Sequence, residues 1–377
     1  MNFVFPLSVD LAKSRGSYLH DELSGASYLD LFSGYASMPL GYNHPVFDAQ
    51  FDQEIRQVAH VRMTNNVMSS QPLRAFVDAL RTHVFSPYLH FTCTGALAVE
   101  AAIKTAMSHA AHAAPKVLCL ENAFHGVNCW GFATSRVGVT AARMADYPDI
   151  GWLHLALPAA IAHLQCLAEA GDVVALIIEP IQATSGDIHL PATQLRELVG
   201  EARRLGICVI MDEIQTGFGV SGTMWYGEQL GIEPDILVFG KKAQVCGICV
   251  SPRFADIFAS PYQKLDVTFD GDLLDMIRAR YILKAYAEHG LVARAPEVAA
   301  RFRAALAGAV ANFRAAGCLI AFDLPDQAIR DALVAACFAD RLLINKAGER
   351  AIRLRPNLAI SDAEIDSACR ILARHLG

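Results

Sequence analysis

Three ionisable side chains, Glu179, Asp212 and Lys241, each follow a short apolar segment of the sequence. A lysine amine can form an imine with an aldehyde, and a carboxylate can hold a proton on a nearby nitrogen base. Asp212 and Lys241 together therefore have the chemistry to bind and activate an aldehyde. A buried structural ion pair between them is the alternative, because such pairs also occupy apolar surroundings.

The elements that must position these side chains are expected to be buried parallel strands. Residues 173–178, 207–211 and 236–239 are short, almost wholly apolar and rich in Val and Ile. The intervals between them are long enough for the crossover helices that parallel strands require. Because ligands of such sheets bind beyond the carboxyl ends of the strands, Asp212 and Lys241 should face one crevice.

A carboxylate and a lysine that face one crevice suggest pyridoxal phosphate. This cofactor needs a lysine for its aldehyde, an acidic partner for its pyridine nitrogen, and a site for its phosphate. Residues 87–92 are predicted to form a strand, Thr94 and Gly95 a turn, and residues 96–106 a helix. Free N–H groups at the start of such a helix bind phosphate, although the same turn can be only a helix cap.

Phe124 and His125 are a fourth candidate part of this site. They follow residues 116–120, another segment with the composition of a strand. An aromatic ring at the carboxyl end of a strand can stack on a planar cofactor, whereas a single phenylalanine more often belongs to a core. The interpretation of Phe124 therefore depends on the motifs around it.

Five motifs follow one another in a specific order along the chain. They are Thr94-Gly-Ala-Leu-Ala-Val-Glu-Ala-Ala-Ile-Lys104, Phe124-His-Gly126, Glu179-Pro-Ile-Gln182, Asp212-Glu-Ile-Gln-Thr-Gly217 and Phe239-Gly-Lys241. In this order they resemble the class III, or ω-, aminotransferases, a family of fold-type I pyridoxal phosphate enzymes, over nearly the whole chain. The chain is most similar to lysine 6-aminotransferases, in residues 241–247, in Thr268 with residues 273–280, and in residues 352–356.

The resemblance implies an α/β fold with two domains. A large, mostly parallel-sheet domain at residues 53–270 would bind the cofactor, and residues 1–52 and 271–377 would form a smaller α+β domain. The sequence pattern of the C-terminal part predicts helices from about residue 272 and at 296–315, 327–338 and 362–374, with short strands at 318–322, 342–345 and 351–354. A chain of 377 residues also exceeds the usual size of one domain.

The cofactor-binding positions of the family match residues of this chain one by one. Lys241 would form the imine, whereas its neighbour Lys242 would not, and Asp212 would bind the pyridine nitrogen. The remaining ring and phosphate contacts would come from Gln215 on the ring hydroxyl, Phe124 on the ring face, and the backbone N–H groups of Gly95 and Ala96 on the phosphate.

Three further residues complete the cofactor site that the resemblance implies. Thr268 would reach the phosphate of the other subunit, because family members are homodimers with a shared active site. His125 would belong to the same set. Glu179 would hold Asp212 or His125 in place, or it would be a plain structural acid.

Two departures from the lysine 6-aminotransferases remove charges that face the substrate. Val127 stands where those enzymes carry Arg, and Thr184 stands where they carry Glu. In the family this glutamate pairs with the arginine matched here by Arg353, and it swings away when a dicarboxylic keto acid binds. Without that partner, Arg353 is expected to bind a carboxylate in both half-reactions. Tyr35 matches another substrate-pocket position.

The change at Val127 should weaken recognition of a second carboxylate, such as the distal one of 2-oxoglutarate. Loss of a buried charge-assisted contact of this kind costs about 2 to 5 kcal/mol. Pyruvate or another monocarboxylic acceptor is therefore an alternative. Arg355, Arg15 or a residue of the partner subunit could instead compensate for the missing charge.

The resemblance implies a two-stage transamination in which Lys241 moves a proton at the donor carbon. The expected donor is the ε-amine of L-lysine or of a similar diamino or ω-amino acid, and the expected acceptor is a keto acid such as 2-oxoglutarate or pyruvate. Because of Thr184 and Val127, a class III racemase or aminomutase and an α-amino acid transaminase are alternatives. A cofactor-binding protein without enzymatic activity is a further alternative.

Composition narrows the class of protein. The net charge is −6 and no basic run occurs, which argues against nucleic acid as a partner. No apolar run approaches membrane-spanning length and the first residues lack a signal-peptide pattern, so we expect a cytoplasmic protein without a membrane partner. Cys246 and Cys249 form the one C-x-x-C pair, but no second pair accompanies them, so we expect core thiols and no metal site.

Overall fold

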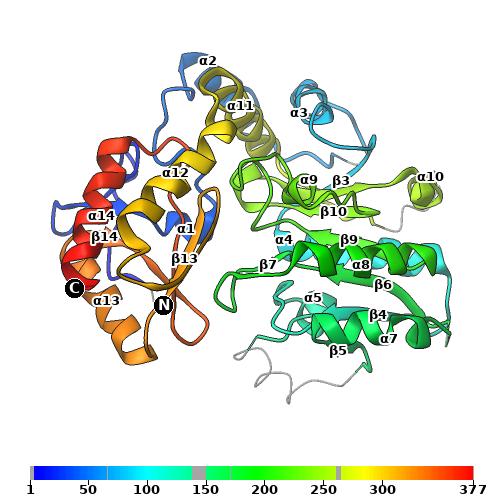
Figure 1. The fold of residues 1–377 in the computed structure, drawn as a ribbon. Helices are drawn as coiled ribbons and strands as arrows, with labels where there is room; N and C mark the ends of the chain where they lie inside the picture. The colour runs from blue at the N-terminus through cyan, green and yellow to red at the C-terminus, as the bar shows by residue number, and fades with distance from the viewer. Residues whose placement is uncertain (1–3, 66, 138–149, 170, 260–264, 377) are drawn as a thin grey trace.

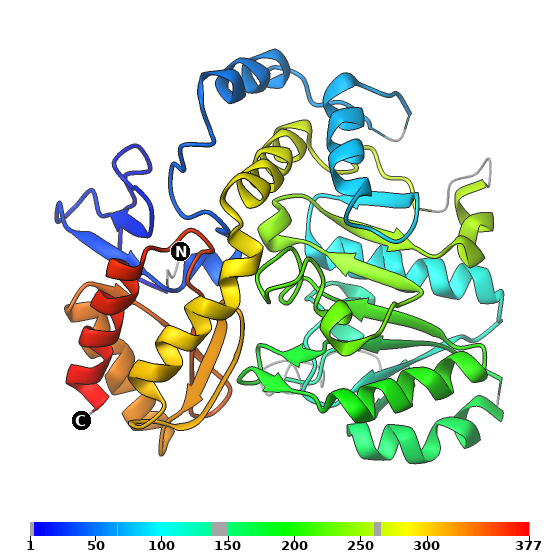
Figure 2. The same ribbon diagram turned by 45° about the horizontal axis from the view of Figure 1, so that its top comes forward.

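The computed structural model describes residues 4–65, 67–137, 150–169, 171–259 and 265–376. Two groups of elements lie side by side in it (Figure 1). The central part of the chain forms a layered α/β unit, and the C-terminal helices and strands pack beside the N-terminal strands. Figure 2 shows helix α11, Leu273–His289, at the junction, where it packs against α2, Ala49–Val58, and α3, Gln71–Arg81.

A seven-stranded sheet forms the centre of the α/β unit, in the order β3-β11-β10-β9-β6-β4-β5. In this order the strands are Tyr88–Thr92, Cys246–Val250, Ile236–Phe239, Cys208–Asp212, Val173–Ile178, Lys116–Leu120 and Leu153–Leu155. β11 runs opposite to the other six strands, which are all parallel to one another. The carboxyl ends of β3, β6, β9 and β10 therefore share one edge, as predicted for the strands that precede Glu179, Asp212 and Lys241.

Helices cover both faces of this sheet, because its strands send alternate apolar side chains to opposite sides. Ile210 packs on the side of α4, Gly95–Ala110, whereas Val209 and Met211 pack on the other side with α7, Leu157–Glu169, and α8, Ala192–Arg204. Smaller elements lie around the sheet. They are the helices α5 (Cys129–Ala133), α9 (Tyr226–Leu230) and α10 (Ala255–Ala259), and the 3-10 turns Lys241–Ala243 and Pro252–Phe254. Cys246 and Cys249 are buried in β11, which confirms the prediction of core thiols.

The second group contains two small sheets. One is antiparallel, in the order β12-β13-β16-β15, with strands Ala311–Ala316, Leu319–Asp323, Ala351–Leu354 and Asn345–Ala347. The other joins β1, Tyr18–His20, and β2, Ser27–Asp30, to β14, Leu342–Leu343. Because β2 and β14 pair, both ends of the chain contribute to one structure, as the sequence pattern predicted. The remaining elements are α1, Ser33–Ala36, β7, Ile181–Gln182, β8, Ile188–His189, α12, Leu291–Leu306, α13, Gln327–Ala339, and α14, Asp362–Leu376.

Two local predictions were wrong. A helix was expected at 296–315, but α12 runs from Leu291 to Leu306 with Pro296 inside it, and residues 311–316 form β12. Pairing with β13 across Gly317, which has a φ of +55°, overrides the helical preference of this Ala-rich segment. The strand expected at 342–345 is divided between two sheets. The proposed domain limit at residues 52 and 53 falls inside α2, and the division itself stays a prediction.

None of the helices in the described ranges combines the length and the apolar character needed to cross a bilayer.

Gly247 is the point of closest backbone approach in the sheet. A Cβ atom built on it would lie 2.4 Å from the carbonyl oxygen of His90 and 3.0 Å from Cζ of Phe239. We expect Gly247→Ala to lower the free energy of unfolding by about 2 to 4 kcal/mol, because neither neighbouring strand can move away. In α8, a Cβ on Gly200 would meet nothing within 4 Å, so Gly200→Ala should stabilise the protein by about 0.5 to 1 kcal/mol. Urea unfolding measures both, and equal effects of the two changes would contradict the prediction.

Candidate active site

The shared edge of β3, β6, β9 and β10 opens into a cavity of about 420 Å³. All the predicted cofactor-binding residues except Thr268 line it, together with the predicted substrate residues Val127 and Thr184. The cavity-lining members of this set are Gly95, Ala96, Phe124, His125, Val127, Glu179, Thr184, Asp212, Gln215 and Lys241. The structure therefore gathers residues that are as far as 146 positions apart, Gly95 and Lys241 (241 − 95), in one site.

Lys241 presents its amine to this cavity from the turn after β10. Its backbone is left-handed, with a φ of +51°, because the chain reverses into a short 3-10 helix at this residue. Burial and the nearby charge of Arg353 lower the pKa of Lys241 to about 8, against the opposing charges of Glu179 and Asp212. A substantial fraction of the amine is therefore neutral, and nucleophilic, in mildly alkaline solution.

Lys242, its neighbour, points elsewhere. It is 1% exposed, and its Nζ donates to the backbone carbonyl of Gln215 and, at 3.4 Å, to that of Ile214. Burial, and then the charge of Lys241, hold its pKa well below the usual value. Only the first of the two lysines lines the cavity.

Asp212 is held at the end of β9 by His125. The Nδ1–H of His125 donates to Oδ2 of Asp212 at 2.8 Å, and Oδ1 accepts from the backbone N–H of Ile214 at 3.1 Å. Both side chains are almost fully buried, at 0% and 4% exposed. The carboxylate of Asp212 is thus oriented by a buried partner, which is the arrangement needed to present a fixed negative charge to a ligand.

Glu179 has different partners from those predicted. Its carboxylate accepts hydrogen bonds from the backbone N–H groups of Phe124 and Ala183, both at 3.1 Å. No hydrogen bond from Glu179 to Asp212 or His125 occurs among the described residues, where His125 itself contacts Asp212, so the role of Glu179 as a support for them or as a plain structural acid stays a prediction. Glu179 instead fixes the backbone before His125 and the turn that carries Thr184. Burial, and next the like charge of Asp212, raise the pKa of Glu179 to about 8.

The start of α4 forms the anion-binding end of the cavity. Thr94 is extended, with φ −144°, and its side chain accepts the N–H of Leu97 at 3.3 Å. This cap leaves the N–H groups of Gly95 and Ala96, at the positive end of the helix, available to a phosphate. A Cβ on Gly95 would lie 2.8 Å from Cδ1 of Ile214, so a side chain there would displace the side chain of Ile214.

The predicted substrate residues lie at different depths. Val127 and Thr184 line the cavity, with Val127 68% exposed at its rim. Arg353 in β16 is 6% exposed and donates from Nη1 to the backbone carbonyl of Ala183 at 2.9 Å. Burial, and then the charge of Arg355, lower its pKa to about 10. Tyr35 lies in a left-handed turn, at φ +59°, and is 47% exposed. It is close enough to Arg353 to oppose slightly the lowering of that residue's pKa.

The structure also places some of the residues that the sequence analysis assigned to the site outside the cavity. Thr268 is exposed and lies outside this cavity. Arg355 does not replace the missing arginine, because it forms a buried ion pair with Asp187 at 2.5 Å. Arg15 donates to the carbonyl of Ser14 instead. Sequence reasoning missed five further cavity residues: Ser37, Gly126, Ile214, Gln244 and Cys246. All but Ser37 lie in motifs that the sequence analysis identified, and this was the available signal: Gly126 in 124–126, Ile214 in 212–217, and Gln244 and Cys246 in 241–247.

Comparisons with known proteins agree with this geometry. The sequence profile of the family Aminotransferase class-III matches residues 4–376. The chain is 35% identical to L-lysine-epsilon aminotransferase of Mycobacterium tuberculosis over 407 residues, covering 96% of this chain and 89% of that protein. It is 32% identical to the enzyme of the same name from Streptomyces clavuligerus, covering 98% and 90%.

A solved structure described as lysine aminotransferase from M. tuberculosis in the internal aldimine form superposes with a TM-score of 0.93. The two chains are 32% identical, and the match covers 99% of this chain and 95% of that one. The chain belongs to the class III aminotransferase family, with the α/β fold of the fold-type I enzymes and pyridoxal phosphate as its cofactor.

The cavity residues fit this cofactor. Oε1 of Gln215 is buried with no hydrogen-bond partner among the described residues, as expected of a group that faces a ligand hydroxyl. Lys241 would hold the aldehyde, Asp212 the ring nitrogen, and Phe124 the ring face, while the start of α4 would hold the phosphate. When bound, the cofactor supplies an electron sink that stabilises negative charge at the substrate carbon.

The raised pKa of Glu179 predicts a pH-dependent stability. Because its pKa rises from 4.5 to about 8 on folding, the folded state keeps a proton that the unfolded state loses between these values. The contribution of Glu179 to the free energy of unfolding therefore falls as the pH rises from about 4.5 to 8.

We expect cofactor-free Glu179→Gln to show a shallower loss of stability across this pH range than the wild type. Urea unfolding at a series of pH values measures the slope. Glu197→Gln, at an exposed position of α8, is the matched control and should leave the slope unchanged. An identical slope for wild type and Glu179→Gln would show that Glu179 is ionised in the folded protein throughout.

Proposed function

We propose that this chain is a homodimeric aminotransferase that transfers the ε-amino group of L-lysine, or the terminal amine of a similar diamino or ω-amino acid, to a keto acid. The observation that carries the proposal is the position of Arg353, a buried guanidinium behind the cavity wall, which donates to the carbonyl of Ala183 beside the lining residue Thr184 and whose charge lowers the pKa of Lys241. The similarity to two L-lysine-epsilon aminotransferases supports the choice of donor.

Different residues of the cavity have different roles in the proposed proton transfer. With the cofactor bound, the amine of Lys241 would take up and return the proton at the donor carbon, and its lowered pKa suits this exchange near pH 8. Asp212, fixed by His125, keeps the ring nitrogen protonated. Phe124, whose backbone is anchored by Glu179, restricts the ring to one plane.

The acceptor is bound through its carboxylate by Arg353. No ion pair of this guanidinium occurs among the described residues, and its Nε has no hydrogen-bond partner there. A buried arginine in this state is a strong receptor for a carboxylate. Because Val127 and Thr184 add no charge to the cavity, we propose that monocarboxylic acceptors such as pyruvate are used at least as well as 2-oxoglutarate.

The same arginine favours a second candidate function. An α-carboxylate bound by Arg353 would bring an α-amino group towards Lys241, so an α-amino acid transaminase, or a racemase or aminomutase of the same family, remains the alternative. In a racemase or aminomutase the proton returns to the substrate and no amino group is passed to an acceptor.

The proposed dimer follows from Thr268. This residue is exposed and lies outside the cavity of its own subunit, which is compatible with the proposed contact to the phosphate of a partner subunit. The absence of a candidate bilayer-spanning helix in the described ranges is compatible with the proposed cytoplasmic location.

The donor experiment separates the two candidate functions. L-Lysine added to the loaded enzyme without an acceptor should convert the cofactor lastingly to its amine form, with one equivalent of semialdehyde released per site. Absorbance spectra and product analysis measure both. A spectrum that returns to its starting form, with lysine unchanged or epimerised, would contradict transamination. If alanine converted the cofactor to its amine form and lysine did not, the ε-amine would be ruled out as the donor.

A second experiment tests the acceptor by restoring a positive charge at position 127, where Val127 stands in place of the arginine of lysine 6-aminotransferases. We expect Val127→Arg to raise kcat/KM for 2-oxoglutarate relative to pyruvate by about tenfold or more, because a charge-assisted contact to the distal carboxylate becomes available. Ile329→Arg, on the exposed side of α13, is a control that adds the same charge away from the cavity. An unchanged ratio for Val127→Arg would show that this position does not face the acceptor.

A further inference from the structure

Two buried arginines lie at the end of one strand. Arg353 and Arg355 are 6% and 2% exposed, and the spacing of two favours the same face of the chain. Burial is the largest cause of the lowered pKa of Arg353, and the charge of Arg355 is the next. Burial and the charges of both arginines also lower the pKa of Lys241. Two like charges in a desolvated site need a counter-ion, because each one disfavours the other.

Asp187 supplies that counter-ion. It lies in the turn between β7 and β8, three residues after Thr184, and is 0% exposed. Its Oδ1 pairs with Nη2 of Arg355 at 2.5 Å, whereas its Oδ2 is buried with no partner among the described residues. Nε of Arg353 is likewise buried and without a partner there, and the charge of Asp187 acts on Arg353.

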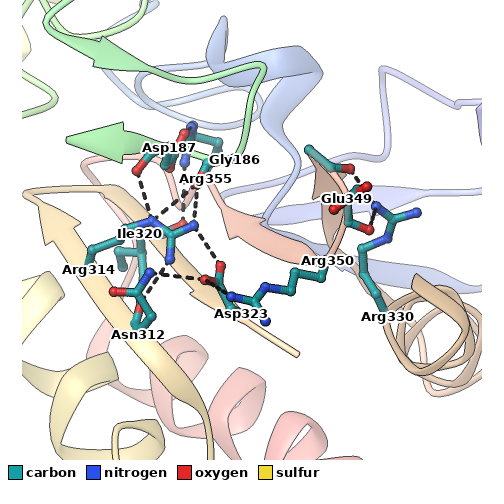
Figure 3. Close-up of polar contacts among 11 residues, drawn as sticks. Gly186, Asp187, Asn312, Arg314, Ile320, Asp323, Arg330, Glu349, Arg350 and Arg355 are labelled. Carbon is teal, nitrogen blue, oxygen red and sulfur yellow. Dashed lines mark hydrogen bonds and ion pairs between the residues drawn. The ribbon is translucent and has the colours of Figure 1, made fainter. Parts of the chain in front are cut away.

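A network across the two groups of elements holds Asp187 in this place (Figure 3). Arg314 in β12 donates from Nε to the carbonyl of Asp187 at 2.8 Å and from Nη2 to the carbonyl of Gly186, while its Nη2 pairs with Asp323 at 2.8 Å. Asp187 is left-handed, with a φ of +53°. Asp and Asn both tolerate this conformation, so the charge can be removed without a change in backbone preference.

We propose that Asp187 is a positioning residue that sets the carboxylate specificity of the site, because it forms an ion pair with Arg355, whereas Arg353 has no ion pair among the described residues and can bind a substrate carboxylate. The proposal rests on the function inferred above, in which Arg353 is the carboxylate receptor. It accounts for a buried ion pair that leaves a carboxylate oxygen unpaired, which is a poor way to stabilise a fold.

Opposite effects are expected from the two partners of the ion pair. In Asp187→Asn, Arg355 is released and becomes a second receptor, so a dicarboxylate should gain affinity relative to a monocarboxylate. In Arg355→Met, the carboxylate of Asp187 loses its partner and competes for Arg353, so both ligands should bind more weakly. The double variant again has no net charge at these two positions and should resemble the wild type.

The proposed role of Asp187 can be tested without turnover, by measuring how unreactive carboxylic acids bind to the enzyme that contains its cofactor. Isothermal titration with glutarate and butyrate gives the two dissociation constants. We expect Asp187→Asn to lower the glutarate constant relative to the butyrate constant by about tenfold, and Arg355→Met to raise both by about tenfold. Shifts of the two single variants in the same direction, or no shift, would overturn the proposal.

Two controls keep the outcomes apart. Arg353→Ala should abolish butyrate binding; if it does not, the receptor in the proposed function is wrong, independently of Asp187. Breaking a buried pair destabilises a protein, so either single variant could fail to fold. The double variant then decides: a glutarate-to-butyrate ratio within about threefold of the wild type supports the proposal, and a tenfold loss of glutarate affinity would show that Arg355 already binds the second carboxylate.

Discussion

The burial of Lys241 among charges of both signs is the constraint on which the rest of the site depends. A buried amine remains usable only if its pKa lies near the working pH, and here burial and Arg353 lower that pKa while Glu179 and Asp212 oppose the shift. The direction of the strands makes this balance possible. Because β6, β9 and β10 are parallel neighbours, their ends deliver one acid, a second acid and the lysine to the same edge.

The acids in this balance have separate tasks. His125 fixes Asp212 in one orientation, so its charge can face a ring nitrogen. Glu179 is anchored to two backbone N–H groups and has a raised pKa, so it adds less negative charge to the cavity than its position suggests. On the proposed substrate side, Asp187 forms an ion pair with Arg355, whereas Arg353 has no ion pair among the described residues. In the proposed function, the site therefore combines a basic amine with one carboxylate receptor.

Features that depend on local pattern were predictable from the sequence. The apolar runs that became β6, β9 and β10, the turn before α4, and the order of the motifs located the cavity and its lysine. Helix α12 was misplaced because the Ala-rich segment after it has helical propensity, and only pairing with β13 makes it a strand. The pair of Asp187 and Arg355 joins residues 168 positions apart, so no local signal could reveal it. The partner of Glu179 was missed for the same reason.

The proposed chemistry depends on a covalent bond between the cofactor and the first of two adjacent lysines. Lys241 lines the cavity, whereas the amine of Lys242 is turned towards the carbonyl of Gln215. Reduction of the loaded enzyme with borohydride, followed by peptide mapping, reads out the attachment point directly. The structure predicts a phosphopyridoxyl label on residue 241. A label on residue 242, or none in this peptide, would contradict the whole arrangement.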